Sequence, residues 1–171
     1  PELDPLTWGH FWQVLGSDEA EASWDAPDTE DLEVVGTIWG GNLAMLTSLV
    51  GTDYFPRIEG GILFIEDIAE PPYRVERMLY HLIHAGVLGR QKALVLGDFT
   101  SYRVAGYDNG YDLPVTFERI AAAAGIPVVQ GLAFGHAPAK FTLPFGVPGS
   151  LRVNAGRARL AFSGHPRPKT P

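Results

Sequence analysis

Short apolar runs and longer amphipathic segments alternate through the middle of this 171-residue chain. Continuous apolar runs and stretches rich in β-branched side chains predict four strands, at residues 33–39, 62–65, 93–96 and 127–130. Apolar positions at helical spacing predict three helices between them, over residues 42–50, 72–83 and 112–124. Glycines 40 and 41 are expected to end the first strand, and Asn42 to cap the helix that follows. Asp112 and Pro114 are expected to open the third helix.

The two ends of the chain follow other patterns. A helix capped by Thr7 is expected over residues 8–15, and the acid-rich residues 18–31 are interpreted as an exposed crossing. Turn residues near the C-terminus separate three expected short strands, at residues 141–145, 151–153 and 159–162. The element order β, α, β, α, β, α, β with a β-rich tail predicts an α/β domain with a mixed sheet.

The domain is expected to begin near residue 33. Residues 1–32 hold three of the four tryptophans and are interpreted as a connector from a preceding domain, with residues 33–171 as the domain itself. The sequence starts with Pro1 rather than Met. We therefore expect it to be a piece of a longer chain.

Composition narrows the class of protein. The net charge of −7 argues against a nucleic-acid or anionic-membrane surface, and no apolar run approaches the length of a membrane span. The chain has no cysteine, which excludes a cysteine nucleophile, a thiolate zinc site and a disulfide. This composition is compatible with the cytoplasm.

Glu66 is the first candidate for a chemical role. It follows the apolar run 62–65 together with Asp67, at the carboxyl end of a strand, where open α/β sheets place their chemistry. A carboxylate this close to a buried strand is expected to be partly desolvated and held by partners. The alternative is an ordinary solvated acid at a strand end.

His136 is the second candidate. It follows an apolar segment and Gly135 and precedes Ala137-Pro138, which indicates a sharp loop at a sheet edge. With Glu66 it would make a general base and its orienting carboxylate, the pair that activates a serine, although a plain surface histidine fits the pattern as well. No G-x-S-x-G motif occurs in the chain, so the serine of such a triad is not found.

A metal-dependent hydrolase is an alternative interpretation of the same residues. Four side chains at expected strand ends or in the adjoining loop carry oxygen or imidazole ligands: Glu66, Asp67, Asp98 and His136. If they gather at one edge of the sheet, they form a hard-metal site. The triad interpretation predicts no metal and no other cofactor.

Seven segments of the chain form a recognisable series: Trp39-Gly-Gly-Asn-Leu-Ala-Met-Leu, Gly61-Ile-Leu-Phe-Ile-Glu-Asp-Ile, Glu70-Pro-Pro-Tyr-Arg-Val-Glu-Arg-Met-Leu, His84-Ala-Gly-Val-Leu, Leu94-Val-Leu-Gly, Gly131-Leu-Ala-Phe-Gly-His and Ser163-Gly-His-Pro. Together they resemble the LD-carboxypeptidase (muramoyltetrapeptide carboxypeptidase) family of serine peptidases, which includes the microcin C immunity proteins. They follow the family's order from about Thr7 to Pro166, and they resemble the C-terminal half of its members.

The resemblance implies a β/β/α swivelling-type domain, the C-terminal half of a two-domain enzyme whose triad is split between domains. Glu66 and His136 would supply the Glu and the His, and a missing N-terminal Rossmann-like domain would supply the serine. Family members are cytoplasmic, dimeric and free of metal and cofactor, and they remove the terminal D-Ala from murein tetrapeptide during cell-wall recycling. By this resemblance the chain alone would be inactive.

Two other functions remain open within the same resemblance. Immunity-type members cleave a peptidyl-nucleotide antibiotic, and the sequence does not choose between that substrate and murein tetrapeptide. A catalytically silent domain that binds a peptide is the remaining alternative.

Overall fold

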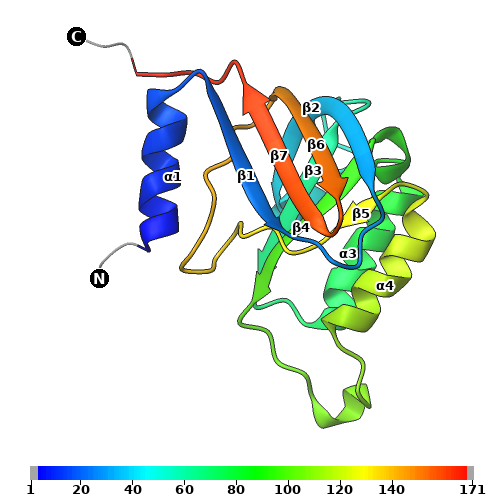
Figure 1. The fold of residues 1–171 in the computed structure, drawn as a ribbon. Coiled ribbons are helices and arrows are strands. Elements are labelled where there is room, and N and C mark those ends of the chain that lie inside the picture. The colour runs from blue at the N-terminus through cyan, green and yellow to red at the C-terminus, as the bar shows by residue number, and fades with distance from the viewer. Residues whose placement is uncertain (1–3, 169–171) are drawn as a thin grey trace.

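The computed structural model describes residues 4–168, which form one mixed seven-stranded sheet with helices on both sides (Figure 1). The strand order is β1-β7-β6-β2-β3-β4-β5. Neighbouring strands from β2 to β5 run parallel, whereas the β2–β6, β6–β7 and β1–β7 pairs are antiparallel. The predicted α/β class with a mixed sheet is confirmed.

The elements follow one another as α1 (Pro5–Gly16), β1 (Glu19–Asp25), β2 (Leu32–Asn42), α2 (Leu43–Leu49), β3 (Ile62–Ile68), α3 (Pro72–His84), β4 (Ala93–Thr100), α4 (Leu113–Ala124), β5 (Val128–Val129), β6 (Val147–Asn154) and β7 (Arg157–Ser163). Two short 3₁₀ turns, Leu88–Arg90 and Gly106–Asp108, lie between them. Within residues 4–168, no helix is long and apolar enough to cross a bilayer.

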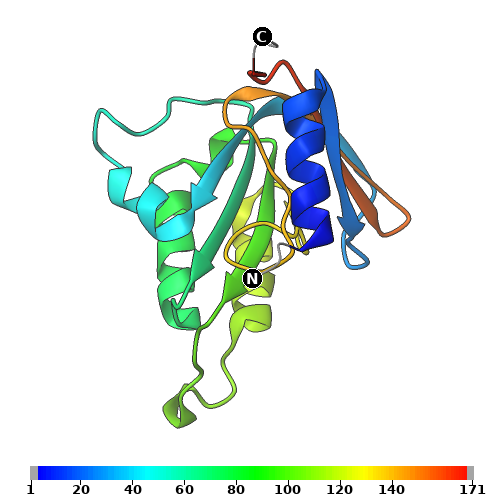
Figure 2. The ribbon, with the colours of Figure 1, turned by 90° about the vertical axis from the view of Figure 1, so that its left-hand side faces the viewer.

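The central strand β3 is buried on both faces, as its continuous apolar run predicts. Ile62 and Phe64 join a core on the side of α1, β1, β6 and β7, whereas Leu63 and Ile65 join a core beneath α2, α3 and α4. The sheet curls so that α3 and α4 cover one face and α1 stands beside β1 at the opposite end (Figures 1 and 2). This geometry gives the strand two hydrophobic layers and leaves its carboxyl end at the rim.

The interpretation of residues 18–31 as an exposed crossing is wrong for residues 19–25. These form β1, which pairs with β7 from Glu19↔Ser163 to Asp25↔Arg157 and buries Ala20, Ala22 and Trp24. The alternation of small apolar and polar residues in this strand is the period-2 pattern of a half-buried strand. The acidic side chains that suggested a loop occupy its outer face.

Three local predictions also need correction. The strand β2 continues through Gly40 and Gly41 to Asn42, because a Cβ at position 40 would strike the backbone of Phe64 and glycine has none. Asp4 caps α1 by accepting the Leu6 N–H, so Thr7 lies inside the helix. Residues 141–145 form no strand, whereas Asn42 and Asp112 cap their helices as predicted.

The role of residues 1–32 as a connector stays a prediction. Within the described part of that range, α1 and β1 pack into the same domain as the rest of the sheet. Residues 1–3 of the predicted connector and residues 169–171 of the predicted domain lie outside the described residues.

Asp67 secures the junction between β3 and α2. Its buried carboxylate accepts hydrogen bonds from Asn42 Nδ2 and from the Ala44 N–H, each at 2.9 Å, and from the Ile68 N–H at 2.8 Å. A carboxylate that satisfies the free N–H groups of a first helical turn stabilises that helix. The role of this acid is therefore structural.

Replacing Asp67 with Asn should destabilise the fold by about 1.5–3 kcal/mol, because an amide has no negative charge and only one acceptor oxygen for these donors. Chemical denaturation followed by circular dichroism measures this loss. Asp53→Asn is the matched control, because Asp53 is exposed and accepts no side-chain hydrogen bond within the described residues. Equal stability of the two variants would contradict the assigned role.

Candidate active site

Glu66 lies at the carboxyl end of β3 with only 4% of its surface exposed. Ile65 pairs with Leu96 and Asp67 pairs with Phe99, so two residues of β4, Gly97 and Asp98, lie opposite Glu66 alone. Such a bulge bends the strand that carries the extra residue and increases the local twist. The carboxylate is therefore held inside the rim of the sheet rather than on its surface.

Two glycines leave the space that the Glu66 side chain occupies. A Cβ on Gly135 would lie 2.8 Å from Glu66 Oε2, and Gly135 has a φ of +127°, which L side chains rarely adopt. A Cβ on Gly97 would lie 2.6 Å from the Phe134 carbonyl oxygen and 3.4 Å from Glu66 Cβ. Larger residues at either position would displace the carboxylate or the loop above it.

His136 meets this carboxylate directly. Its Nδ1 lies 2.7 Å from Glu66 Oε2, and the imidazole is about half exposed whereas the carboxylate is buried. Nδ1–H therefore donates to the carboxylate, which leaves Nε2 as the basic nitrogen of the neutral ring. No atom of residues 4–168 hydrogen-bonds to Nε2. The pair has the geometry of a general base and its orienting acid.

Three hydrogen bonds, from β4 and from within the loop, hold the loop that carries His136. The Asp98 N–H donates to the Phe134 oxygen at 2.8 Å, and the Phe141 N–H donates to the Ala133 oxygen at 2.7 Å. Lys140 Nζ reaches the Gly135 oxygen at 3.2 Å. These bonds fix the loop at its base and across its middle, although it contains no helix or strand.

Helix α1 holds the same loop from outside. Thr7 Oγ1 donates to the Pro138 oxygen and accepts the Lys140 N–H, both at 2.9 Å. One turn further on, His10 Nδ1 accepts the Thr142 N–H while its Nε2 donates to the Glu21 oxygen, both at 3.0 Å. A neutral imidazole can make both hydrogen bonds, because it has one donor and one acceptor nitrogen. Burial lowers the pKa of His10 and so favours this neutral form.

Asp98 is a second acid beside the pair. Burial raises the pKa of its carboxyl group, and the charge of Glu66 raises it further, while a backbone hydrogen bond from Phe134 and the charge of Lys140 act against the shift. Its Oδ2 is buried without a hydrogen-bond partner among the described residues. The group therefore takes up a proton more readily than an ordinary aspartate.

The four residues of the metal alternative do not converge. Glu66 and His136 are in contact, but the Asp67 carboxylate is bound to Asn42 and Ala44 at the start of α2. Residues 4–168 contain no group of three or more His, Asp or Glu side chains arranged to hold a metal ion. The geometry fits an acid–base pair better than a metal centre.

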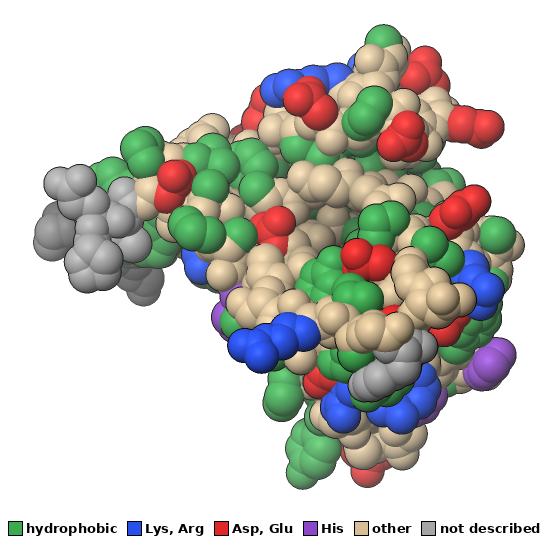
Figure 3. Space-filling view, turned by 90° about the horizontal axis from the view of Figure 1, so that it is seen from below, with side chains coloured by type: hydrophobic (Ala, Val, Ile, Leu, Met, Phe, Trp, Pro, Cys, Tyr) green, Lys and Arg blue, Asp and Glu red, His purple; other side chains and the backbone are tan. Residues whose placement is uncertain are grey.

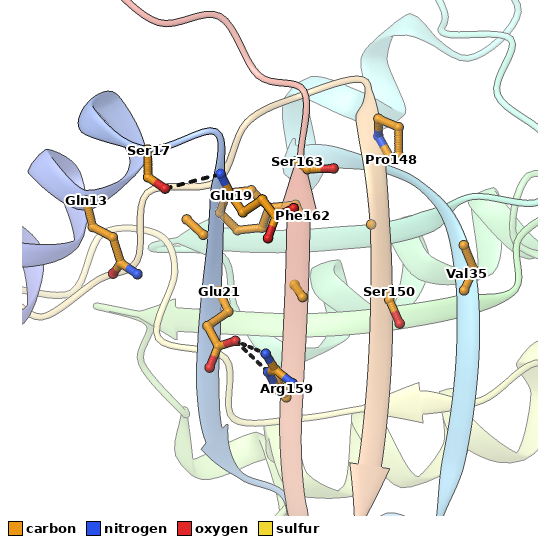
Figure 4. A pocket seen from close by; sticks show the side chains of 13 residues that line it. Gln13, Ser17, Glu19, Glu21, Val35, Pro148, Ser150, Arg159, Phe162 and Ser163 are labelled. Carbon is orange, nitrogen blue, oxygen red and sulfur yellow. Dashed lines mark hydrogen bonds and ion pairs between the residues drawn. The ribbon is translucent and has the colours of Figure 1, made fainter.

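The described chain places no serine at His136. A shallow groove of about 620 Å³ on the antiparallel half of the sheet contains Ser17, Ser150 and Ser163 (Figure 4). Its polar centre is the ion pair of Glu21 with Arg159, and no histidine lines it. The serines of this groove therefore have no general base.

Sequence reasoning paired Glu66 with His136 but missed the residues that hold them. The sequence predicts Thr7 as a helix cap and Gly97 only as the end of a strand, and it indicates no role for His10 or Lys140. Gly135 was noted only as a turn residue. Their contacts join positions up to 133 residues apart, so local patterns give no signal for them.

Known proteins resemble this chain over most of its length. Residues 35–151 match the model of the LD-carboxypeptidase C-terminal domain. A probable murein peptide carboxypeptidase of Bacillus subtilis (strain 168) is 29% identical over 155 residues, which cover 89% of this chain and 49% of that protein. The chain thus spans about half the length of this relative.

Solved structures agree with this match. The crystal structure of muramoyltetrapeptide carboxypeptidase from Oxalobacter formigenes superposes with a TM-score of 0.93 at 46% identity, over 96% of this chain and 57% of that chain. The microcin C7 self immunity protein MccF superposes with a TM-score of 0.76 at 22% identity, over 98% of this chain and 58% of that one. The second likeness concerns the fold alone.

Thr7→Val should loosen the His136 loop, because valine keeps the shape of threonine but cannot bridge the Pro138 oxygen and the Lys140 N–H. We expect faster hydrogen exchange at the Lys140 amide, measured by NMR. Thr52→Val is the matched control, since Thr52 likewise donates to a carbonyl, Leu49, and accepts an N–H, from Tyr54, but within its own turn. Unchanged exchange at Lys140 in Thr7→Val would refute the anchoring role.

Acidification should weaken the fold through His10. Its pKa is lowered in the folded state, so the unfolded chain binds the proton more readily, and the stability from the neutral ring is lost as pH falls below the unfolded value of 6.5. Unfolding free energy measured from pH 7.5 to 5 should fall less steeply in His10→Gln than in the parent chain. The exposed His84 serves as control: His84→Gln should keep the parent slope.

Proposed function

The chain belongs to the LD-carboxypeptidase C-terminal domain family, and we propose that Glu66 and His136 are two members of a serine-peptidase triad. The reaction proposed for the complete protein is removal of the terminal D-Ala from murein tetrapeptide in cell-wall recycling. The observation that carries this proposal is the 2.7 Å contact between His136 Nδ1 and the buried Glu66 carboxylate, with Nε2 left free. The nucleophilic serine comes from another domain of the complete protein.

His136 is the general base of the first half-reaction. Nε2 accepts the proton of the serine hydroxyl as its Oγ forms a bond to the carbonyl carbon before D-Ala. The imidazolium then gives this proton to the leaving amine as the carbon–nitrogen bond breaks, and D-Ala departs. In the second half, Nε2 takes a proton from water, which attacks the acyl ester, and returns it to the serine oxygen.

Glu66 acts through His136 and does not touch the substrate. Its carboxylate fixes the ring with the proton on Nδ1, so that the basic lone pair of Nε2 points outward. It also stabilises the imidazolium that forms in each half-reaction. Because the carboxylate is buried, water does not compete for this hydrogen bond.

A peptidyl-nucleotide antibiotic is the second candidate substrate. MccF structures hold glutamyl sulfamoyl guanosine and aspartyl sulfamoyl adenosine, and they share the fold of this chain at 22% identity. The 46% identity to the Oxalobacter formigenes muramoyltetrapeptide carboxypeptidase favours murein tetrapeptide. Comparing turnover of the two substrates by the complete protein decides between them, and turnover of neither would leave the silent peptide-binding domain.

His136→Ala should abolish measurable turnover of a D-Ala-terminated tetrapeptide, a loss of about 10⁶-fold. Glu66→Gln should reduce turnover by about 10⁴-fold, since an amide neither fixes the ring nor stabilises its charged form. The assay uses the complete protein and measures released D-Ala. His81→Ala and Glu59→Gln, both exposed, are the matched controls and should keep parent activity.

A retained rate in His136→Ala would refute the proposed triad. So would loss of activity with a chelator accompanied by an equal loss in Asp67→Asn, because that combination is the signature of the metal alternative. Circular dichroism of each variant separates a lost catalytic group from a lost fold.

A further inference from the structure

The outward side of α1 is an exposed aromatic surface. Trp8 and Trp12 each leave 51% of their surface in solvent, and Phe11 leaves 39%. The rings contact one another edge to face, at 5.4 Å between Trp8 and Trp12 and 5.3 Å between Phe11 and Trp12. We call these three residues the aromatic stripe. Figure 3 shows hydrophobic side chains gathered over this end of the molecule.

The stripe has the composition of a binding surface. The twelve residues of α1 include no Asp, Glu, Lys or Arg, so no charged side chain interrupts the aromatic rings. Single exposed apolar residues are common on protein surfaces, but a contiguous group of large aromatic rings without charges is typical of the centre of an interface. Trp residues in such positions carry much of the binding energy.

The stripe lies on the helix that anchors the His136 loop. Residues four apart lie on the same side of a helix, so Phe11 follows Thr7, whose hydroxyl is bonded to Pro138 and Lys140 in the His136 loop. Trp8 and Trp12 continue the surface around the helix from there. The stripe and the anchor of the His136 loop therefore belong to one helix.

We infer that the aromatic stripe is the docking surface for the domain that carries the nucleophilic serine, an inference that rests on the proposed function. That domain has to deliver a hydroxyl to His136 and so lies over the loop that α1 anchors. The related Oxalobacter formigenes chain extends well beyond the 57% that matches this one, which leaves ample length for such a domain. The docking face of the partner is apolar, because the stripe offers it no charge.

Acrylamide quenching of tryptophan fluorescence tests this docking without substrate. Trp24 and Trp39 are 6% and 0% exposed, so Trp8 and Trp12 dominate the quenchable signal of the 171-residue chain. In the complete protein this signal should be lost, because the serine-bearing domain covers both rings. The Trp8→Phe/Trp12→Phe variant, which keeps only the buried tryptophans, assigns the signal.

The outcomes separate the possible occupants. Quenching of Trp8 and Trp12 that is equal in the chain and in the complete protein would overturn the inference. Protection that arises in the 171-residue chain alone and grows with its concentration would assign the stripe to a second copy and also overturn it. Fluorescence quenching measures docking, whereas released D-Ala measures catalysis. A wrong triad assignment would therefore change the D-Ala assay without changing the quenching result.

A paired set of variants tests the energetic role of the stripe in the complete protein. Trp8→Gln/Trp12→Gln should lower kcat/KM by about tenfold or more, because the serine domain is no longer held over His136. Trp8→Phe/Trp12→Phe should retain most of the activity by keeping apolar rings. Tyr54→Gln is the control, since Tyr54 is 83% exposed and lies outside the stripe. Parent activity in the double glutamine variant would contradict the inference.

Discussion

The hydrogen bond between the buried Glu66 carboxylate and His136 requires that both the strand and the loop that carry these residues be held rigidly. A buried carboxylate is costly unless its partner is fixed in place, so the histidine cannot sit on a freely moving loop. The strand β3 supplies the rigid side of the pair, because two hydrophobic layers cover it. The glycines at 97 and 135 leave room for the Glu66 side chain, and the hydrogen bonds across the His136 loop hold the histidine in place.

The neighbouring acids Glu66 and Asp67 show how a strand separates two tasks. Successive side chains of a strand point to opposite faces, so Glu66 faces the histidine loop whereas Asp67 faces the start of α2. Both carboxylates are buried, and composition alone does not distinguish them. Their hydrogen-bond partners distinguish them. Glu66 accepts from an imidazole whose second nitrogen is free, whereas Asp67 accepts only from the amide groups of Asn42, Ala44 and Ile68, which hold the fold.

The sequence allowed prediction of what depends on local pattern. Apolar runs located β3 and β4, glycine next to His136 indicated the loop, and the caps at Asn42 and Asp112 follow from side-chain chemistry. Strand β1 was missed because its pairing partner lies far along the chain and its apolar residues are mostly alanines. The strand predicted at residues 141–145 does not form. An apolar run does not indicate whether its N–H groups will bond to a neighbouring strand or, as at Thr142, to an imidazole.

The pairing of the first strand with the last one has a consequence for how the protein is made. His165 Nε2 bonds to the Val14 oxygen, 151 positions away along the chain, and β1 pairs with β7 over its whole length. At about 5–20 residues per second, a ribosome needs about 7–30 s to add those residues. During that time β1 lacks its partner β7, so the free N–H and C=O groups of its edge can pair with a strand of another chain, which makes this edge an aggregation site until β7 is made.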